Sequence, residues 1–417
     1  MKSLELNVIT HIHTKASNGP ASSLDQMAKS ILTDIFGAIP EGLIWRECFT
    51  DTQDLRQILA GKRTVNPIDI LLLTDHMSSR HHSLDANLQQ LAVEDRRVGL
   101  GCEIQTVCYS EKLGKYLTAP EVLLYGNGKD RFFKGKPYTG VDDLMLDTLY
   151  TECSVPGSTE PDIARVNRFC QKNRLACALA HPFDCQQLDL DETLAVIGSF
   201  RFIETVNGGF PRRSAEALQE YVAFHNSVLG NNLAHSLLEQ EWSDEQRRRI
   251  KKISTSHLLV PLGGSDAHLN NFDRAMTRFR TVPEKKNAVD FIDTMLTSSA
   301  AEILRSNLLA PVGRGVSMTG LYRDVLGIIG KNIRVYKNHF SRPSIWPKLL
   351  RALMTTGAKE LKERIVRNKS IACEYRAQLD IPTMQKAATT LSREKKHHPK
   401  VATPAIIASH VNSGRTM

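Results

Sequence analysis

At 417 residues, with 41% hydrophobic side chains, the chain is long enough for two or three domains with a buried core. It contains no run of 18 apolar residues, and its first ten residues lack the apolar stretch and cleavage site of a signal peptide, so we expect no transmembrane helix and no secretion. The eight cysteines form no C-x-x-C pair, which favours reduced thiols in a cytoplasmic protein.

The net charge of +9 is unevenly distributed. Residues 301–417 hold 21 Lys and Arg against 7 Asp and Glu, a net charge of +14, whereas residues 1–300 hold 33 against 38, a net charge of −5. A basic tail on a mildly acidic body predicts an anionic partner for the tail, either a membrane surface or nucleic acid.

Short apolar runs with β-branched residues recur along the chain and predict buried strands. They occupy residues 4–10, 68–74, 98–107, 175–180, 201–206 and 257–264. Stretches with helical period or composition lie between most of them, for example residues 161–173 and 212–229. This alternation predicts an α/β fold with a mostly parallel sheet, and both a barrel and a doubly wound sheet fit it.

Two stretches interrupt the alternation. Residues 109–158 contain a loop rich in Gly, Lys and Asp, and residues 231–256 carry a charged helix. After about residue 305 the alternation stops, and basic helices precede a polar end that we expect to be disordered. We therefore predict a body of residues 1–304 with these two insertions, and a basic, mostly helical extension of residues 305–417.

Histidines and carboxylates occur at the ends of the predicted strands. His11 and His13 stand one residue apart at the end of the first strand, and Asp266 and His268 do so after the last. Because residues i and i+2 of a strand point to the same face, each pair presents two side chains together.

Three further strands carry the same residue types, with Asp75 and His76 in LTDH, Glu103 in GCEI and His181 in LAHPF. The functional loops of parallel α/β folds lie at the carboxyl ends of the strands, so we expect five segments to meet at one rim. Each motif alone has a simpler explanation, such as a helix cap or a packed histidine. Together and in order they predict a site for divalent metal ions, and ligands without thiolate suit Zn, Mn or Fe.

Six segments follow one another along the chain: HIHT, LLLTDH, GCEI, LAHPF, IETVNG and GGSDAH. In this order they resemble the PHP (polymerase and histidinol phosphatase) domain superfamily, over roughly residues 5–285. The resemblance implies a distorted (β/α)7 TIM-like barrel that holds two or three divalent metal ions. It also implies an enzyme that hydrolyses a phosphoester with metal-activated water, acting on a phosphorylated small molecule or a nucleic-acid end.

The resemblance also implies roles for single residues. The implied metal ligands are His11, His13, His76, Glu103, His181, Asp266 and His268. The first ion would take the two histidines of HIHT together with Glu103 and Asp266. Glu103 and His181 would contribute to a second ion, and His76 and His268 to a third or shared position.

Four further polar residues have expected roles near the metals. Asp75 would orient a histidine, and Asp75 or His268 is a candidate for moving a proton. Arg80 and Arg212 follow strand ends and could bind phosphate through two hydrogen bonds each, although solvated arginines are the alternative. Asn207 is a candidate for substrate binding or for a structural role.

Two positions depart from the family pattern. Residues 17–19 read SNG where the family often has SDG or a histidine, and the neutral Asn18 is a poor metal ligand. Val122 and Leu123 stand near the place where the family often has a histidine after the glutamate. We therefore expect fewer or weaker metal ions than in the family, unless the adjacent histidines at 81–82 substitute.

Two alternatives to a phosphoesterase fit the same residues. One is a hydrolase of another bond that uses the same metals, and the other is a degenerate metal-binding barrel that acts as an interaction module. The extension has Tyr336 and Trp346 among basic residues, which fits an anionic membrane surface, nucleic-acid phosphates or helices packed on the barrel.

Overall fold

A computed structural model gives the fold of most of the chain. The structure describes residues 3–18, 26–43, 46, 48–78, 83–126, 131–184, 187–209, 212–267, 272, 274–282, 286–313, 316–359, 362, 380, 383 and 386–392.

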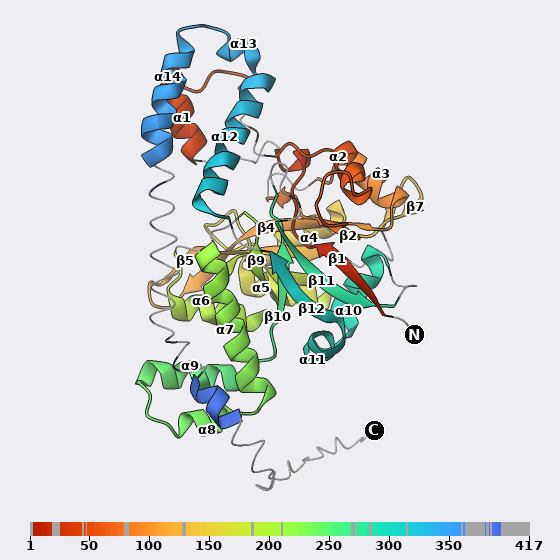
Figure 1. Cartoon of the computed structure of the whole chain (residues 1–417), viewed down its shortest axis with the longest axis vertical. Helices are drawn as coiled ribbons and strands as arrows, with labels where there is room; N and C mark the ends of the chain where they lie inside the picture. Colours follow the sequence, from red (N-terminus) through yellow and green to blue (C-terminus); the bar gives the residue numbers. More distant parts are fainter. Residues whose placement is uncertain are drawn as a thin grey trace.

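A single large sheet of strands lies at the centre of the described part of the molecule (Figure 1). Its strands are β1 (Leu4–Ile9), β2 (Ile70–Leu73), β3 (His76–Met77), β4 (Val98–Ser110), β5 (Lys115–Tyr125), β8 (Ala176–Leu179), β9 (Phe202–Asn207), β10 (Val260–Gly264), β11 (Ala275–Thr281) and β12 (Leu308–Gly313). They follow the order β10-β9-β8-β5-β4-β2-β1-β11-β12, and β3 pairs with β4. Because β10 also lies against β11 and β12, the sheet curls into a nearly closed barrel. The expected α/β fold is confirmed at this level.

The sheet is mixed, which corrects the expectation of a mostly parallel one. All six predicted strands are present, and β1, β2 and β4 run parallel, as do β8, β9 and β10. The longer strands that the sequence did not predict run antiparallel: β5 against β4 and β8, and β11 against β1 and β12. The tight turn 111–114, with Gly114 at φ 63°, forces the hairpin β4–β5, because a parallel pairing needs a much longer crossover.

Strand alternation separates an apolar layer of the barrel from a polar one. Leu123 and Phe202 belong to one buried apolar cluster with residues of β1, β2, β8 and β10. Glu121 on β5 lies two residues from Leu123, and Glu204 on β9 lies two residues from Phe202. Each glutamate therefore points to the same face of its strand as that apolar residue. Residues 115–125, inside the stretch 109–158 set apart in the sequence, thus form a central strand that brings a carboxylate toward the carboxyl ends of its neighbours.

Helices surround the sheet (Figure 1). They are α2 (Thr52–Leu59), α3 (Ala86–Glu94), α4 (Asp143–Cys153), α5 (Ile163–Lys172), α6 (Leu190–Ser199), α7 (Arg212–Gly230), α8 (Ala234–Leu238), α9 (Asp244–Ser254), α10 (Ala288–Thr297) and α11 (Ala300–Glu302). A short hairpin, β6 (Phe132–Phe133) and β7 (Lys136–Pro137), lies apart from the sheet. Asp51 and Asp189 begin α2 and α6 with reciprocal side-chain to backbone hydrogen bonds, which fix where these helices start.

A separate helical module stands beside the barrel, at the top of Figure 1. It consists of α1 (Gln26–Phe36), α12 (Met318–Val335), α13 (Lys337–Phe340) and α14 (Ile345–Ala352), which continues into a wider helical turn, Leu353–Gly357. Its own apolar core joins Ile31, Leu32 and Ile35 of α1 to Ile329 and Leu349. The basic helices expected in the extension are therefore present, and they pack on a helix from near the start of the chain.

Candidate metal centre

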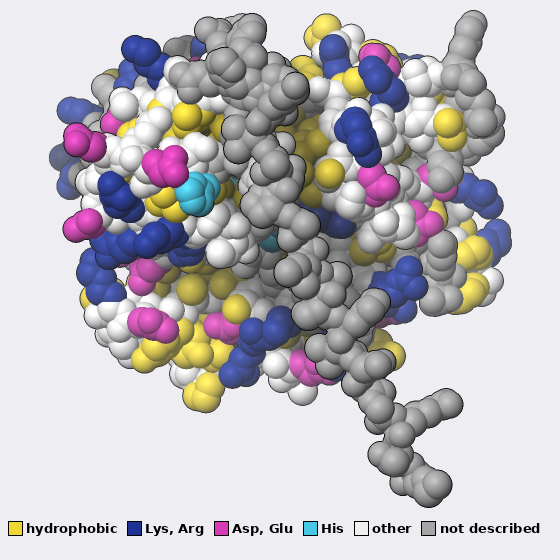
Figure 2. All heavy atoms as spheres, turned by 90° about the horizontal axis from the view of Figure 1, so that it is seen from below, with side chains coloured by type: hydrophobic (Ala, Val, Ile, Leu, Met, Phe, Trp, Pro, Cys, Tyr) yellow, Lys and Arg dark blue, Asp and Glu magenta, His cyan; other side chains and the backbone are white. Residues whose placement is uncertain are grey.

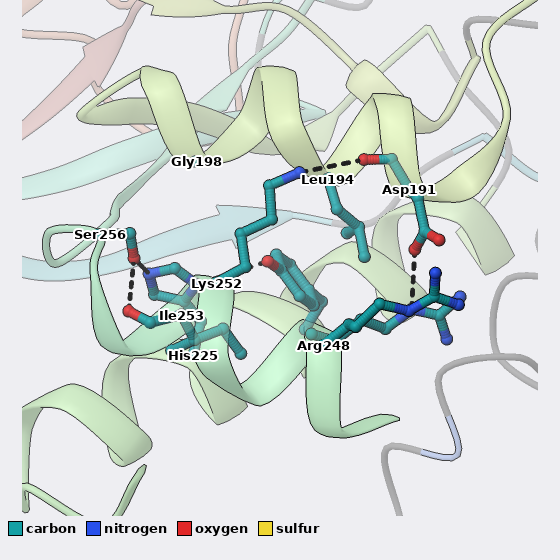
Figure 3. Close-up of a pocket in the computed structure, with 10 residues that line it drawn as sticks. Asp191, Leu194, Gly198, His225, Arg248, Lys252, Ile253 and Ser256 are labelled. Carbon is teal, nitrogen blue, oxygen red and sulfur yellow. Dashed lines mark hydrogen bonds and ion pairs between the residues drawn. The ribbon is translucent and has the colours of Figure 1, made fainter. Parts of the chain in front are cut away.

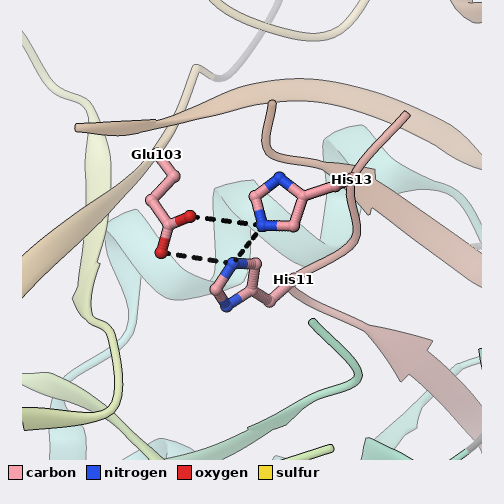
Figure 4. Close-up of side chains that lie close together, drawn as sticks. All are labelled: His11, His13 and Glu103. Carbon is pink, nitrogen blue, oxygen red and sulfur yellow. Dashed lines mark hydrogen bonds and ion pairs between the residues drawn. The ribbon is translucent and has the colours of Figure 1, made fainter. Parts of the chain in front are cut away.

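His11 and His13 lie just beyond β1 and are fully buried. Their Nε2 atoms are 3.1 Å apart, and both face the carboxylate of Glu103 on β4 (Figure 4). His11 Nε2 is 3.3 Å from Glu103 Oε1, and His13 Nε2 is 3.2 Å from Glu103 Oε2. The HIH motif and the strand-end glutamate therefore meet as the sequence predicted.

Two further histidines reach the same carboxylate from other segments. His76 Nδ1 lies 3.0 Å from Glu103 Oε2, and His181 Nε2 lies 3.4 Å from Glu103 Oε1. Four imidazoles thus surround one glutamate whose side chain is only 1% exposed. Although two ring nitrogens are near it, Glu103 Oε1 makes no hydrogen bond of acceptable geometry among the described residues.

Asp266 completes the deep part of the cluster. Its Oδ1 lies 3.1 Å from His13 Nε2 and 3.7 Å from His11 Nε2, and its backbone N–H donates to the carbonyl of His11. Asp266 and His181 adopt left-handed backbone conformations, with φ of 45° and 25°. Non-glycine residues rarely adopt such conformations, and they occur preferentially at functional sites.

Hydrogen bonds fix the tautomers of the two buried histidines. The Glu204 carboxylate, 3.0 Å from His11 Nδ1, only accepts, so His11 carries its proton on Nδ1. Ser17 Oγ donates to Asp75 at 2.7 Å and lies 3.2 Å from His13 Nδ1, from which it accepts. The two Nε2 atoms therefore face each other across 3.1 Å. A proton or a metal ion between them satisfies both nitrogens.

The spacing of these atoms fits metal coordination. Two donors that each lie about 2.1 Å from one ion are separated by about 3.0–3.4 Å at octahedral to tetrahedral angles. Two groups of donor atoms lie close enough to hold an ion: His11, His13 and Glu103 form one, and His76, Glu103 and Glu121 form the other. Glu103 belongs to both groups, and a carboxylate is the side chain best able to bridge two ions.

The carboxylates also act on the protonation of the histidines. Burial lowers the pKa of His76, but the charge and hydrogen bond of Glu103 outweigh burial and raise it to about 9. Burial likewise opposes the shift at His11 and His181, whose pKa values nevertheless lie well above the usual value because of Glu103 and neighbouring carboxylates. In the opposite direction, burial would raise the pKa of Glu103, but His11 and His76 hold it well below its usual value. The cluster therefore attracts cations.

Two residues of the site were missed in the sequence. Glu121 lies 3.3 Å from His181 Nε2, and Glu204 binds His11 and also accepts from the Asn207 side chain at 2.8 Å. Each is a single carboxylate among mainly apolar residues, in PEVLLY and FIETV, and that carboxylate was the available signal. Glu121 precedes Val122 and Leu123, which are buried and offer no ligand atom.

The remaining predicted residues have different outcomes. Asp75 is buried and accepts from Thr14 and Ser17, so its link to His13 passes through Ser17. Asn207 donates to Glu204 and accepts from the backbone N–H of Gly209, so both ends of its side-chain amide are engaged.

Arg212 is exposed and pairs with Glu216 at 2.7 Å on its own helix, which fits the solvated alternative. His268, Arg80 and the histidines at 81–82 lie outside the described residues. The role of Asn18 as a ligand also falls outside what the structure describes.

A cavity of about 270 Å³ lies elsewhere, between α6, α7 and α9, and contains none of these ligands (Figure 3). Its His225 is held by the carbonyl of His257 at 3.0 Å and by Ser256 at 2.9 Å, and Arg249 pairs with Asp191. Burial lowers the pKa of His225 to about 4, so this histidine is neutral at physiological pH. Its polar groups largely satisfy one another, which indicates a structural cluster.

Comparison with known proteins adds no assignment. No family model matches the chain, and no curated protein matches it. Among the described residues, no helix is long and apolar enough to cross a membrane.

Proposed function

We propose that this chain is a metal-dependent phosphoesterase built on a TIM-like barrel of PHP type. The observation that carries the proposal is the position of Glu103 between two groups of donors, with His11 and His13 on one side and His76 and Glu121 on the other. Such an arrangement suits two neighbouring Zn, Mn or Fe ions, and paired ions are a common solution for phosphoester hydrolysis.

The residues divide the site into a deep part and an open part. The side chains of His11 and His13 are 0% exposed, whereas those of His76 and Glu121 are 34% and 25% exposed. A phosphoryl group would therefore enter past His76 and Glu121. At the floor, Glu204 and Ser17 hold the two imidazoles with their Nε2 atoms toward the centre, so that little reorganisation is needed on binding.

When bound, the metal ions would supply an activated water and neutralise charge on the phosphoryl oxygens. The chain itself contributes the positions of the ligands and the exclusion of bulk water from the floor. The extra carboxylates of Glu121 and Glu204 make the site more anionic than a purely imidazole set, which strengthens its attraction for divalent cations.

The test combines elemental analysis with phosphoester hydrolysis by the full-length protein. We expect bound Zn, Mn or Fe and chelator-sensitive hydrolysis of p-nitrophenyl phosphate or its diester, both lost in His11→Ala. His235→Ala is the matched control, since that side chain is 88% exposed on α8 and away from the centre. A protein that retains its metals but is inert toward a broad phosphoester panel would contradict the proposed reaction, and one without metal would contradict the centre itself.

A further inference from the structure

Helix α14 is apolar on two sides. Ile345, Leu349 and Ala352 are buried in the core of the helical module. On another face of the same helix and its continuation, Trp346, Leu350 and Met354 have exposures of 50%, 64% and 65%. These three residues are spaced four apart, so they form one continuous exposed stripe along the helix.

Other apolar side chains of the helical module are exposed on α12. Leu326 and Val335 of the neighbouring α12 are also exposed, at 40% and 47%. Among the described residues, half of the ten large hydrophobic side chains with high exposure lie in the helical module. Of these, the stripe on α14 is continuous, and a continuous apolar stripe marks a contact with a partner more often than scattered exposed residues do.

The charge of the module restricts the kind of partner. Residues 325–359 contain seven Lys and Arg and no Asp or Glu. Lys348 and Arg351 of α14 and Arg342 before it are exposed, and they have no ion-pair partner within the part of the chain that the structure describes. A nearby carboxylate, Asp324, already pairs with Arg274 of the barrel. The surface therefore combines exposed apolar side chains with exposed basic ones.

We propose that α14 lies flat on an anionic lipid bilayer. In this arrangement Trp346, Leu350 and Met354 enter the boundary between headgroups and acyl chains, and Arg351 contacts lipid phosphates from the flank of the helix. Lys348, farther around the helix, adds attraction to the anionic surface at longer range. Tryptophan favours this depth of a bilayer. Nucleic acid would account for the cations but not for the exposed Leu350 and Met354, and a second copy of the chain would bring like charges together.

The proposal stands apart from the hydrolase activity, because the stripe contains no residue of the metal centre. It would place the barrel at a membrane surface through a helix that lies on the bilayer. The cations should contribute about fivefold each to binding, since one basic residue near an anionic leaflet stabilises the bound state by that factor.

Co-sedimentation of the full-length protein with vesicles tests the proposal. The vesicles contain phosphatidylcholine with or without phosphatidylserine, at low and at high salt. We expect binding that requires phosphatidylserine, weakens with salt, and falls at least about tenfold in Leu350→Gln/Met354→Gln and in Lys348→Gln/Arg351→Gln. Matched controls are Leu144→Gln, 75% exposed on α4, and Lys172→Gln on α5, which should bind like the unmodified protein.

Several results would overturn the proposal. They are no binding to phosphatidylserine vesicles, binding that neither double variant weakens, a stripe-dependent dimer in analytical ultracentrifugation without vesicle binding, or binding to duplex DNA with none to vesicles. Melting curves of each variant establish that it folds, and both double variants change only exposed side chains. A fluorescence shift on vesicle binding that disappears in Trp346→Phe gives a second, independent measurement of insertion.

Discussion

Glu103 Oε2 lies 3.2 Å from His13 Nε2 and 3.0 Å from His76 Nδ1, although the three residues belong to separate segments of the barrel. The sheet order explains this contact. β4 is separated from β1 only by β2, and the short β3 pairs with β4 so that His76 stands beside Glu103 in register. The order and register of the strands therefore place the Glu103 carboxylate within reach of both histidines. Removing it should affect every donor around it.

Replacing Glu103 with Gln should remove the shared charge while preserving size. We expect the protein to lose at least one metal ion per chain and its chelator-sensitive hydrolysis to fall by at least about 100-fold, because both donor groups lose an anionic ligand. Elemental analysis and initial rates check this. Glu5→Gln, at an exposed position of β1, should leave both unchanged. If Glu103→Gln kept its full metal content, the ions would have to bind away from Glu103.

Glu204 should act through His11 rather than on a metal directly. Glu204→Ala removes the acceptor of the His11 Nδ1 proton and should lower metal affinity about 10–100-fold, measured by competition with a chromogenic chelator. Glu204→Gln keeps an amide oxygen that accepts the same hydrogen bond, so we expect it to recover most of the affinity. Equal losses in both variants would indicate that the charge of Glu204, and not its hydrogen bond, matters.

The parts of the site that the sequence predicted are those that follow from strand ends. His11, His13, His76, Glu103, His181 and Asp266 all meet in the structure. Their placement needed only the rule that side chains at the carboxyl ends of neighbouring strands share one rim, and the positions of β1, β2, β4, β8 and β10 were readable from apolar runs.

Glu121 shows why the rest was not predictable. It stands at the middle of β5, and it reaches the rim only because β5 runs antiparallel to β4 and β8. Strand direction depends on the turn 111–114 and on long-range pairing, which hydrophobic periodicity does not encode. The position of Glu204 was also not predictable. Strand alternation places it on the same face as Phe202, but its depth in the barrel depends on how β9 is aligned with β8 and β10.

Glu121 should therefore affect only the outer donor group. In Glu121→Ala we expect the ion near His76 and Glu103 to bind more weakly, while the ion between His11 and His13 remains. Metal titration should show two classes of site in the unmodified protein and a selective loss of one. Glu121→His supplies a neutral nitrogen donor in its place and should restore part of the affinity. A variant that loses all metal would contradict the separation into two groups.

His225 gives a prediction about stability that does not involve the metal centre. Burial lowers the pKa of His225 from 6.5 to about 4, although its Nε2–H donates to the carbonyl of His257. A group whose pKa is lower in the folded protein takes up its proton first in the unfolded chain. Its contribution to stability is therefore complete above about pH 6.5 and is lost as the pH falls toward about 4.

Between about pH 7.5 and pH 5 this loss amounts to about 2 kcal/mol of the free energy of unfolding. Urea unfolding at these two pH values should show it in the unmodified protein, with His225→Gln losing about 2 kcal/mol less over the same interval. The metal centre is the same in both proteins, so its contribution cancels in the comparison. His235→Gln, whose side chain is 88% exposed, should keep the full pH dependence. Parallel losses in the unmodified protein and in His225→Gln would show that His225 is not held neutral by burial, and that the cluster between α6, α7 and α9 is open to water.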